Sequence, residues 1–221
     1  MTAEPPIPTD TIDEAFARRW LGEFVARFDE QAKVLADLDR QAGDGDFGAN
    51  LGAALRRAEG FLDRDNPGTF AEVFFAVSKG FLNTGGTSGP LFGMWFREIA
   101  KATSPEPVTV AALAAGVATG LATIQRLAGA DVGDSTMVDA IAPAAAALQA
   151  SSAAGNDLRE ALTAAARAAE RGAESTRDLL AGRGRASYVG EIARGVLDPG
   201  AVAVALFFAA AVTAAGGSAL N

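Results

Sequence analysis

The chain has 221 residues, of which 49% are hydrophobic, with a formal net charge of −8 and neither cysteine nor histidine. Without these residues it can form no disulfide, no thiolate or histidine metal site and no Ser-His-Asp triad, and it has no histidine general base. The chemistry of this chain must therefore use carboxylates, cations and hydroxyls. The negative charge argues against nucleic acid or an anionic membrane surface as the main partner.

Residues 1–9 are rich in proline and do not resemble a signal peptide. We expect them to be a flexible tail, residues 10–221 to form one domain, and the protein to be cytoplasmic. The uncharged stretches 107–125 and 199–221 are about as long as a membrane-spanning helix. Both are mostly alanine, glycine and threonine and only weakly hydrophobic, so we expect buried helices of a bundle and no membrane span.

Helical patterns follow one another along the chain. The first begins at a capping box, Thr11–Glu14, continues as a buried stripe and ends near Asp29; the stripe is Ile12, Phe16, Trp20, Phe24 and Phe28. A short second helix is expected around residues 34–38, and further helices over residues 51–62, 69–82, 91–102, 109–125, 137–148, 156–180 and from 199 onward. About eight helices and no convincing strand predict an all-α fold. In an up-and-down arrangement, the loops after every second helix would gather at one end.

The segment 39–50, which we call the acidic turn, holds three carboxylates and three glycines. Glycine on both sides of Asp44 frees the backbone to aim Asp44 and Asp46 at one point, and Asp39 can add a third carboxylate from the preceding helix. Three converging carboxylates repel one another unless a cation lies among them, and an all-oxygen set suits Mg²⁺. The acidic turn therefore indicates a magnesium site presented to a phosphate ligand.

Three other interpretations compete with a magnesium site in the acidic turn. Gly43-x-Gly45-x-x-Gly48 matches a dinucleotide fingerprint, but a helix rather than a strand precedes it, and two aspartates would face the pyrophosphate. An EF-hand loop from Asp44 would need oxygen ligands where Gly48 and Leu55 stand. A solvated acidic turn, in which Asn50 caps the next helix, stays open.

Three later segments add polar groups suited to phosphate. The glycine turn, residues 83–90, offers backbone N–H groups, hydroxyls and a helix N-terminus, although a well-capped turn would have the same sequence. A Gly/Asp segment, residues 129–137, leads into another helix. The basic segment 182–188 could neutralise phosphate or stack on a base, or be a solvated loop. Asp198-Pro199-Gly200 then starts the last helix with proline in its first turn.

Taken together and in this order, these segments resemble the nucleotide-binding L subunit of dihydroxyacetone kinase. The matching residues are Asp39 with 43–50, Gly85 to Leu91, Gly133 to Met137, Gly184 to Tyr188 and Asp198 to Gly200. The resemblance runs from about residue 10 to the end of the chain. It implies an eight-helix antiparallel barrel that holds ADP or ATP at one end with two Mg²⁺ ions.

The resemblance also assigns residues. Asp39, Asp44 and Asp46 would be the metal ligands, and the nucleotide would be bound by Phe47, Gly48, Ala49, Asn50, Thr87, Ser88, Met137, Arg185, Asp198, Pro199 and Gly200. Within that set, residues 48–50 and 87–88 would contact phosphates, Met137 would flank the adenine, and Arg185 with residues 198–200 would close the site. Many bacterial members of the family have histidine where this chain has Phe47, and lysine where it has Ser135. These two departures from the family pattern bear on nucleotide affinity and on the class of partner.

The activity that the resemblance implies is phosphoryl transfer from Mg-bound nucleotide to dihydroxyacetone, held covalently by a histidine of a separate K subunit. This chain would be inactive alone. The family contains ATP-using kinases and others whose bound ADP is rephosphorylated by a phosphotransferase-system protein, and a free-standing subunit of this length resembles the second kind. A nucleotide-binding partner of a transcription regulator, a kinase subunit for another short sugar such as a tetrulose, and a homodimer stay open.

Overall fold

The computed structural model describes residues 11–179 and 195–217; the expected tail, residues 1–9, lies outside them. Over these residues the chain is helical and contains no strand longer than one isolated bridge. The elements are α1 (Glu14–Ala42), α2 (Phe47–Asp65), α3 (Phe70–Leu82), α4 (Ser88–Ala102), α5 (Val110–Ala128), α6 (Met137–Ala154), α7 (Leu158–Ser175), a 3₁₀ turn η1 (Thr176–Asp178) and α9 (Pro199–Ala214). The all-α prediction is confirmed.

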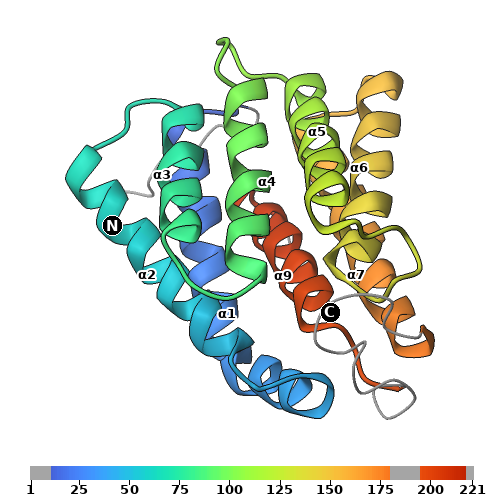
Figure 1. Ribbon diagram of the computed structural model, residues 1–221. Coiled ribbons are helices and arrows are strands. Elements are labelled where there is room, and N and C mark those ends of the chain that lie inside the picture. The colour runs from blue at the N-terminus through green and yellow to red at the C-terminus, as the bar shows by residue number, and fades with distance from the viewer. Residues whose placement is uncertain (1–10, 180–194, 218–221) are drawn as a thin grey trace, which may run out of the picture.

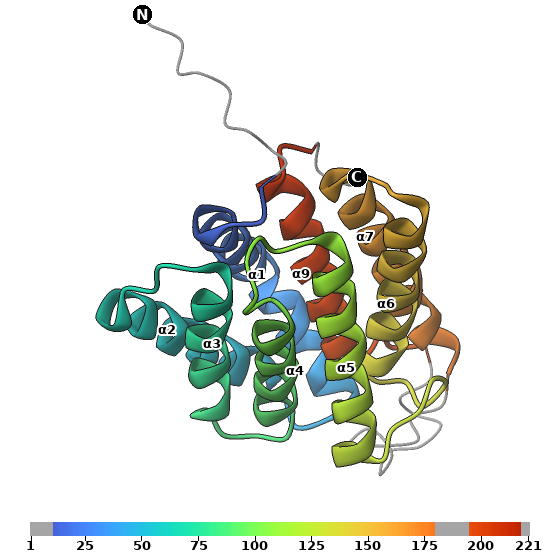
Figure 2. The same ribbon diagram turned by 90° about the horizontal axis from the view of Figure 1, so that it is seen from above.

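The eight described α-helices close into a ring. Each helix packs against the next one along the chain, and α9 packs against both α7 and α1. Figure 1 shows α9 behind α4 and α5, and the view from above in Figure 2 shows it between α1 and α7. Neighbouring helices approach closely: a Cβ added to Gly80 of α3 would lie 2.5 Å from the backbone nitrogen of Ala58 on α2.

Aromatic side chains fill the inside of the ring. The predicted stripe on α1 is buried along its whole length. Trp20 of this stripe stacks on Phe207 of α9 with ring centroids 4.5 Å apart, and its Nε1–H donates to the Phe207 carbonyl at 2.7 Å. Trp95 and Phe96 of α4 contact the same Phe207 ring from the other side of the core. The first and last helices are therefore joined through one aromatic cluster, whose burial stabilises the closed ring.

The predicted break in the first helix is wrong. α1 is one helix of 29 residues that runs through Asp29 to Ala42, and its N-cap is Asp13 rather than Thr11. The residues after Phe28 are charged or polar, but they include neither glycine nor proline, and such residues do not end a helix by themselves. Leu35 is buried on the same helix, whereas Val34 is 48% exposed.

Several other boundaries differ from those predicted. α2 begins at Phe47 rather than Leu51, and α4 begins at Ser88 rather than Leu91. α6 extends past Leu148 to Ala154, and α7 is capped by Asp157 and ends at Ser175. The early starts matter most for function. They turn parts of the acidic turn and of the glycine turn into the first turns of helices.

The connections that carry the predicted polar segments lie at one end of the ring. The α1–α2, α3–α4 and α5–α6 connections are at the lower end in Figure 1, as the up-and-down arrangement predicted. The described chain also leaves α7 at Leu179 and returns to α9 from Gly195 at this end.

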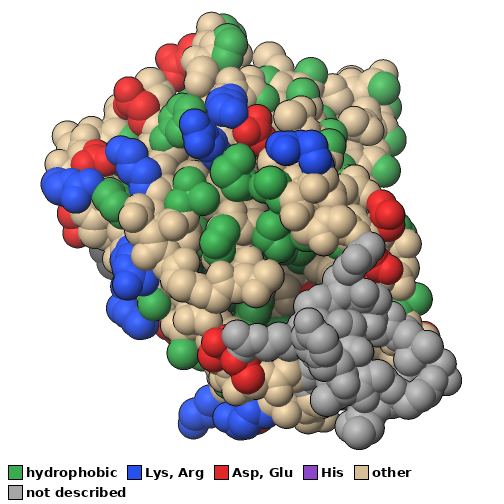
Figure 3. All heavy atoms as spheres, in the orientation of Figure 1, with side chains coloured by type: hydrophobic (Ala, Val, Ile, Leu, Met, Phe, Trp, Pro, Cys, Tyr) green, Lys and Arg blue, Asp and Glu red, His purple; other side chains and the backbone are tan. Residues whose placement is uncertain are grey.

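Among the described helices, α5 alone is long and apolar enough to cross a membrane by length and composition, and a third of its most apolar window is buried. In the ring it packs between α4 and α6. α9 is apolar but shorter, with 16 residues. On the face in Figure 3, hydrophobic side chains gather in the middle, while side chains of both charges lie around them.

Candidate functional site

The structure brings the three predicted metal ligands together. Asp39 lies in the last turn of α1, and Asp44 and Asp46 follow in the connection to α2. One carboxylate oxygen from each lies within 4.8 Å of the others. Among the described residues, this is the one cluster of three acidic side chains close enough to hold a metal ion. Gly45 between the two later aspartates has φ +79°, a conformation that glycine adopts without strain. Carboxylate oxygens at this spacing fit a hard divalent cation such as Mg²⁺.

Asp39 is held in place by the backbone. Its Oδ2 accepts the N–H of Phe47, the first residue of α2, at 2.9 Å. The close approach on its other side requires Gly43, because a Cβ there would lie 2.5 Å from Asp39 Oδ1. The acidic turn therefore fixes one ligand from two directions before any ion binds.

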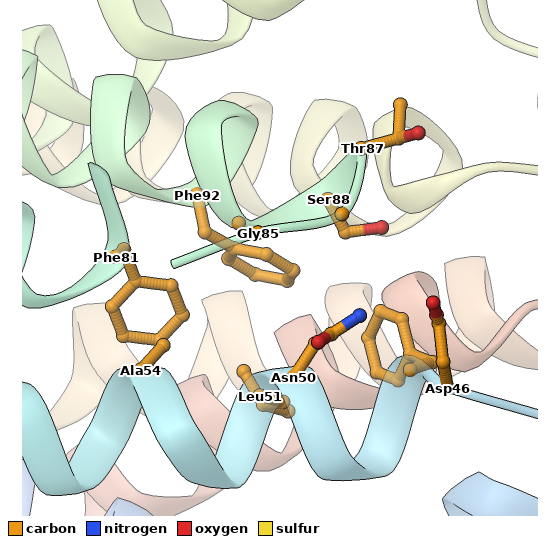
Figure 4. Close-up of a pocket in the computed structure, with 12 residues that line it drawn as sticks. Asp46, Asn50, Leu51, Ala54, Phe81, Gly85, Thr87, Ser88 and Phe92 are labelled. Carbon is orange, nitrogen blue, oxygen red and sulfur yellow. The ribbon is translucent and has the colours of Figure 1, made fainter. Parts of the chain in front are cut away.

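Beside the carboxylates a cleft opens between α2 and the glycine turn, and it encloses about 310 Å³, part of it open to solvent. Asp46 and Asn50 extend from α2 toward Ser88 at the start of α4, and Phe81 and Phe92 form the apolar end (Figure 4). Phe47, Thr87 and the glycines of the glycine turn also line it. The structure thus places the acidic turn and the glycine turn, two segments separated by about 40 residues, on opposite walls of one cleft.

Neither helix that begins at this cleft is capped by the side chain of its own N-cap residue. Neither Asp46 at the start of α2 nor Thr87 at the start of α4 makes a capping hydrogen bond. The other described α-helices are all capped, by Asp13, Thr69, Thr109, Thr136, Asp157 and Asp198. The first N–H groups of a helix have no partner within it. At α2 the Asp39 carboxylate accepts the Phe47 N–H, so the start of α4 is the N-terminus at this cleft that best suits an anion.

Asn50 does not cap α2, which corrects one part of the alternative interpretation. It lies within the first turns of the helix, and its N–H donates to the Asp46 carbonyl at 2.9 Å. Its side chain faces the glycine turn instead: a Cβ on Gly86 would lie 2.8 Å from Asn50 Nδ2. Gly86 has φ +85°, so both its conformation and its neighbour require glycine.

The α5–α6 connection is built around a buried carboxylate that the sequence reasoning missed. Asp139 is 4% exposed, and its two oxygens accept the N–H groups of Gly133 at 2.6 Å and Thr136 at 2.8 Å. With Thr136 it forms a capping box at the start of α6. The pattern Thr-x-x-Asp was the signal that could have revealed it. Met137, the predicted adenine contact, is buried at the first position of α6.

Ser135 is shaped by this connection. It has φ +56°, is 8% exposed and donates its Oγ–H to the Thr176 carbonyl at 3.3 Å. A non-glycine residue in that conformation is uncommon and is maintained by its surroundings. Ser135, one of the two departures from the family pattern expected from the sequence, is therefore enclosed and hydrogen-bonded to η1.

Asp198 lies at the same end and begins α9. Its Oδ2 accepts the Ala201 N–H at 2.7 Å. Gly200 packs closely against Met137, because a Cβ added to Gly200 would lie 3.3 Å from Met137 Cβ. Burial of the carboxyl raises the pKa of Asp198 to about 7; the carboxylates of Asp139 and Asp39 add to the rise, while hydrogen bonds from backbone N–H groups oppose it. The predicted residues 198–200 thus lie close to the acidic turn and to the start of α6.

Arg185 lies outside the described residues, so its predicted role stays a prediction. The sequence reasoning also missed the buried Thr176, and Phe81 and Phe92 as the apolar end of the cleft. Their helical spacing marks the two phenylalanines as core residues, and nothing in their local sequence marks the cleft. Thr176 carries no sequence signal either, because its partners lie far away along the chain.

Comparisons with known proteins show which family this chain resembles in sequence and fold. The model of the DAK2 domain matches residues 41–213. The ADP-binding subunit DhaL of PEP-dependent dihydroxyacetone kinase 1 from Listeria innocua is 35% identical over 199 residues, which are 90% of this chain and 95% of that protein. The ADP-binding subunit DhaL of the PTS-dependent dihydroxyacetone kinase from Lactococcus lactis has the same identity and coverage.

Longer relatives contain a similar region. Rat triokinase/FMN cyclase is 39% identical over 178 residues, which are 78% of this chain and 30% of that one. The crystal structure of the C. freundii dihydroxyacetone kinase with AMP-PNP and Mg²⁺ matches with a TM-score of 0.68 and 28% identity, over 96% of this chain and 36% of that chain. The family match over most of the sequence and the bacterial relatives matched over nearly their whole length show that the chain belongs to the DAK2 domain family, as a DhaL-type member.

Proposed function

We propose that this chain is the nucleotide-binding subunit of a dihydroxyacetone kinase. It holds an adenine nucleotide with Mg²⁺ in the cleft and passes a phosphoryl group to a short keto-sugar carried by a separate K-type subunit. The observation that carries the proposal is the meeting of three carboxylates, within 4.8 Å of one another, with a cleft at which α4 begins without a capping bond from its N-cap side chain. These two features complement the two parts of a metal-bound polyphosphate.

The roles of the residues follow from their placement. Asp39, Asp44 and Asp46 would hold Mg²⁺, and we propose two ions because three carboxylates exceed the one or two that a single ion usually takes. Bound Mg²⁺ would neutralise the charge of the phosphates during transfer. The first-turn N–H groups of α4 would donate to phosphate oxygens, and Asn50 would keep the glycine turn at the required distance from α2. Phosphoryl transfer needs mainly such positioning and charge stabilisation.

The rest of the nucleotide would lie toward α6 and α9. Asp198, Pro199 and Gly200 are close to Met137, so a base beside Met137 would lie on the same side of the acidic turn as these residues. Phe47 would contribute its buried ring to the cleft wall and, unlike histidine, could not donate a hydrogen bond to phosphate. We assign the adenine to this side and the phosphates to the cleft.

The sugar must be held elsewhere, because this chain has no histidine to bind it covalently. The names of the Listeria and Lactococcus relatives include PEP-dependent and PTS-dependent. We therefore propose a phosphotransferase-system protein as phosphoryl donor, retained ADP as the carrier, and a cytoplasmic location. A nucleotide sensor that acts on a transcription regulator would share this cleft, but it would not form phosphorylated sugar when mixed with a K-type subunit.

The test begins with retention of nucleotide. Protein purified in Mg²⁺ and denatured with acid should release adenine nucleotide, measured by ion-exchange chromatography, and Asp44→Asn should abolish the release because it removes one charge from the metal site. Asp63→Asn is the matched control, since Asp63 is an exposed carboxylate near the other end of α2.

Thermal unfolding gives a second measurement. After removal of nucleotide, addition of Mg²⁺ and ADP at about 100 times their dissociation constant should raise Tm by roughly 5 to 10 °C, because a ligand that binds only the folded state stabilises it by about 2.7 kcal/mol. No released nucleotide together with an unchanged melt at millimolar Mg²⁺ and ADP would refute the proposed function.

A further inference from the structure

Thr176 joins three elements at the site end of the ring. It is fully buried at the first position of η1, where α7 ends. Its Oγ1 accepts the backbone N–H of Asp198 at 2.9 Å, and its carbonyl accepts the Oγ–H of Ser135 at 3.3 Å. One residue therefore connects the end of α7 with the N-cap of α9 and with the α5–α6 connection.

The bond to Asp198 determines where α9 begins. Asp198 is the N-cap of α9, and its Oδ2 in turn accepts the Ala201 N–H at 2.7 Å. Thr176 thus anchors the backbone of the residue whose carboxylate caps the helix. A shift of Asp198 would carry Gly200 away from Met137, against which it packs.

The hydroxyl of Thr176 is itself oriented. Its O–H donates to the Ala173 carbonyl at 2.6 Å, so its lone pairs are directed away from α7 and one accepts the Asp198 N–H. The next residue reinforces the connection, because the Arg177 carbonyl accepts the Gly195 N–H at 2.9 Å. The segments that enter and leave residues 180–194 are therefore pinned together beside Thr176.

We propose that Thr176 is a positioning residue for nucleotide binding: its hydroxyl holds the start of α9 in register with the start of α6, and so sets the distance between Gly200 and Met137. The inference rests on the proposed function, because it assigns a part to this network only if a nucleotide lies beside these two residues. Thr176 does not touch the nucleotide and acts through Asp198.

The test compares variants that differ in the Thr176 hydroxyl, which donates to the Ala173 carbonyl and accepts the Asp198 N–H. Thr176→Val keeps the shape of the side chain and removes the acceptor for the Asp198 N–H, while Thr176→Ser keeps the hydroxyl. Losing one buried hydrogen bond that supports the bound geometry should weaken the affinity for Mg-ADP about tenfold in Thr176→Val, and Thr176→Ser should stay within about threefold of wild type. Titration calorimetry on the full chain gives the dissociation constants.

The chain offers a matched control at the opposite end of the ring. Thr103 is also fully buried after the last turn of a helix, and its Oγ1–H donates to the Ile99 carbonyl of its own helix at 2.8 Å. Thr103→Val should reduce the free energy of unfolding by an amount similar to Thr176→Val, yet leave Mg-ADP affinity unchanged. Should Thr176→Val fail to fold, Thr176→Ala replaces it, because alanine and serine differ by the hydroxyl oxygen alone.

The outcomes separate the two proposals. Weaker binding in Thr176→Val, with Thr176→Ser and Thr103→Val near wild type, supports the positioning role. Wild-type affinity in Thr176→Val, or equal weakening in Thr103→Val, overturns it and leaves the proposed function intact. If the wild-type chain itself binds no Mg-ADP, the proposed function fails first and takes this inference with it.

Discussion

Asp39 and Phe47 are joined across the connection between α1 and α2, where the Phe47 N–H donates to Asp39 Oδ2 at 2.9 Å. The bond ties the last turn of one helix to the first residue of the next. It gives Asp39 a fixed orientation toward Asp44 and Asp46, with which it forms the acidic cluster. The acidic cluster is therefore organised by the backbone, and the Mg²⁺ binding that we propose for it should respond to changes that never touch a carboxylate.

Gly43→Ala tests this dependence. The added Cβ would lie 2.5 Å from Asp39 Oδ1, too close for either group to stay in place, so the carboxylate must shift. We expect the affinity for Mg²⁺, measured by titration calorimetry in the presence of ADP, to fall about tenfold, as a loss of roughly 1.4 kcal/mol would produce.

Gly60→Ala is the control for this change. Gly60 is an exposed residue of α2 with no atom within 4 Å of an added Cβ. Gly60→Ala should raise the free energy of unfolding by roughly 0.5 to 1 kcal/mol, because alanine is favoured over glycine inside a helix. It should leave the Mg²⁺ affinity unchanged. Equal Mg²⁺ affinity in the two variants would contradict the role given to Gly43.

Gly86→Ala and Gly85→Ala form a matched pair in the glycine turn. At Gly86 a side chain meets Asn50 Nδ2 at 2.8 Å and must adopt φ +85°, whereas at Gly85 no atom lies within 4 Å. We expect Gly86→Ala to lower the free energy of unfolding by about 1 to 2 kcal/mol through backbone strain, and to weaken ADP binding by displacing one wall of the cleft.

Gly85→Ala should be close to wild type in both properties. Urea unfolding and ADP titration of the two variants measure the difference. If both behaved alike, the contact between Asn50 and the glycine turn would have no importance for the cleft.

Asp198→Asn tests the raised pKa of Asp198. Because the pKa is about 7 in the folded chain and near 3.8 in the unfolded chain, the folded state binds the proton more tightly. The contribution to stability is fully present below about pH 4 and is lost as the pH rises toward 7, by at most about 4 kcal/mol. Asparagine removes the titration and remains a good N-cap.

The measurement is urea unfolding of the metal-free protein in EDTA. Between pH 5 and pH 8, wild type should lose up to about 3 kcal/mol of stability relative to Asp198→Asn. Asp139 and Asp39, the carboxylates that add to the rise in the Asp198 pKa, are present in both proteins, so the comparison changes Asp198 alone. Parallel pH profiles would show that Asp198 is ionised in the folded chain throughout this range.

The sequence predicted the parts of this fold that depend on local chemistry. The predicted stripe is buried as expected, because the four-residue spacing keeps Phe16 to Phe28 on one face of α1; Ile12 is also buried but precedes the helix. The convergence of Asp39, Asp44 and Asp46 also follows from local glycines. The charged residues after Phe28 misled the prediction of where α1 ends, because charge by itself does not stop a helix.

Features that depend on distant contacts could not be predicted in this way. The bonds of Thr176 to Ser135 and Asp198 join residues 41 and 22 positions apart, and only packing of the ring brings them together. The same holds for Phe81 and Phe92, whose place at the apolar end of the cleft is set by where α2 meets α4. The predicted binding roles of all the site residues, Met137 and Arg185 included, remain predictions.

The contact between Trp20 and Phe207 has a consequence for biosynthesis. These two residues are 187 positions apart, so α1 must wait for the synthesis of all the residues between them before its aromatic partner emerges from the ribosome. Until then, its apolar stripe has no final covering and is open to wrong association. Closure of such a distant contact is expected to be a late, comparatively slow event in maturation, and a chain cut short before the last helix should be found in inclusion bodies rather than as a smaller working subunit.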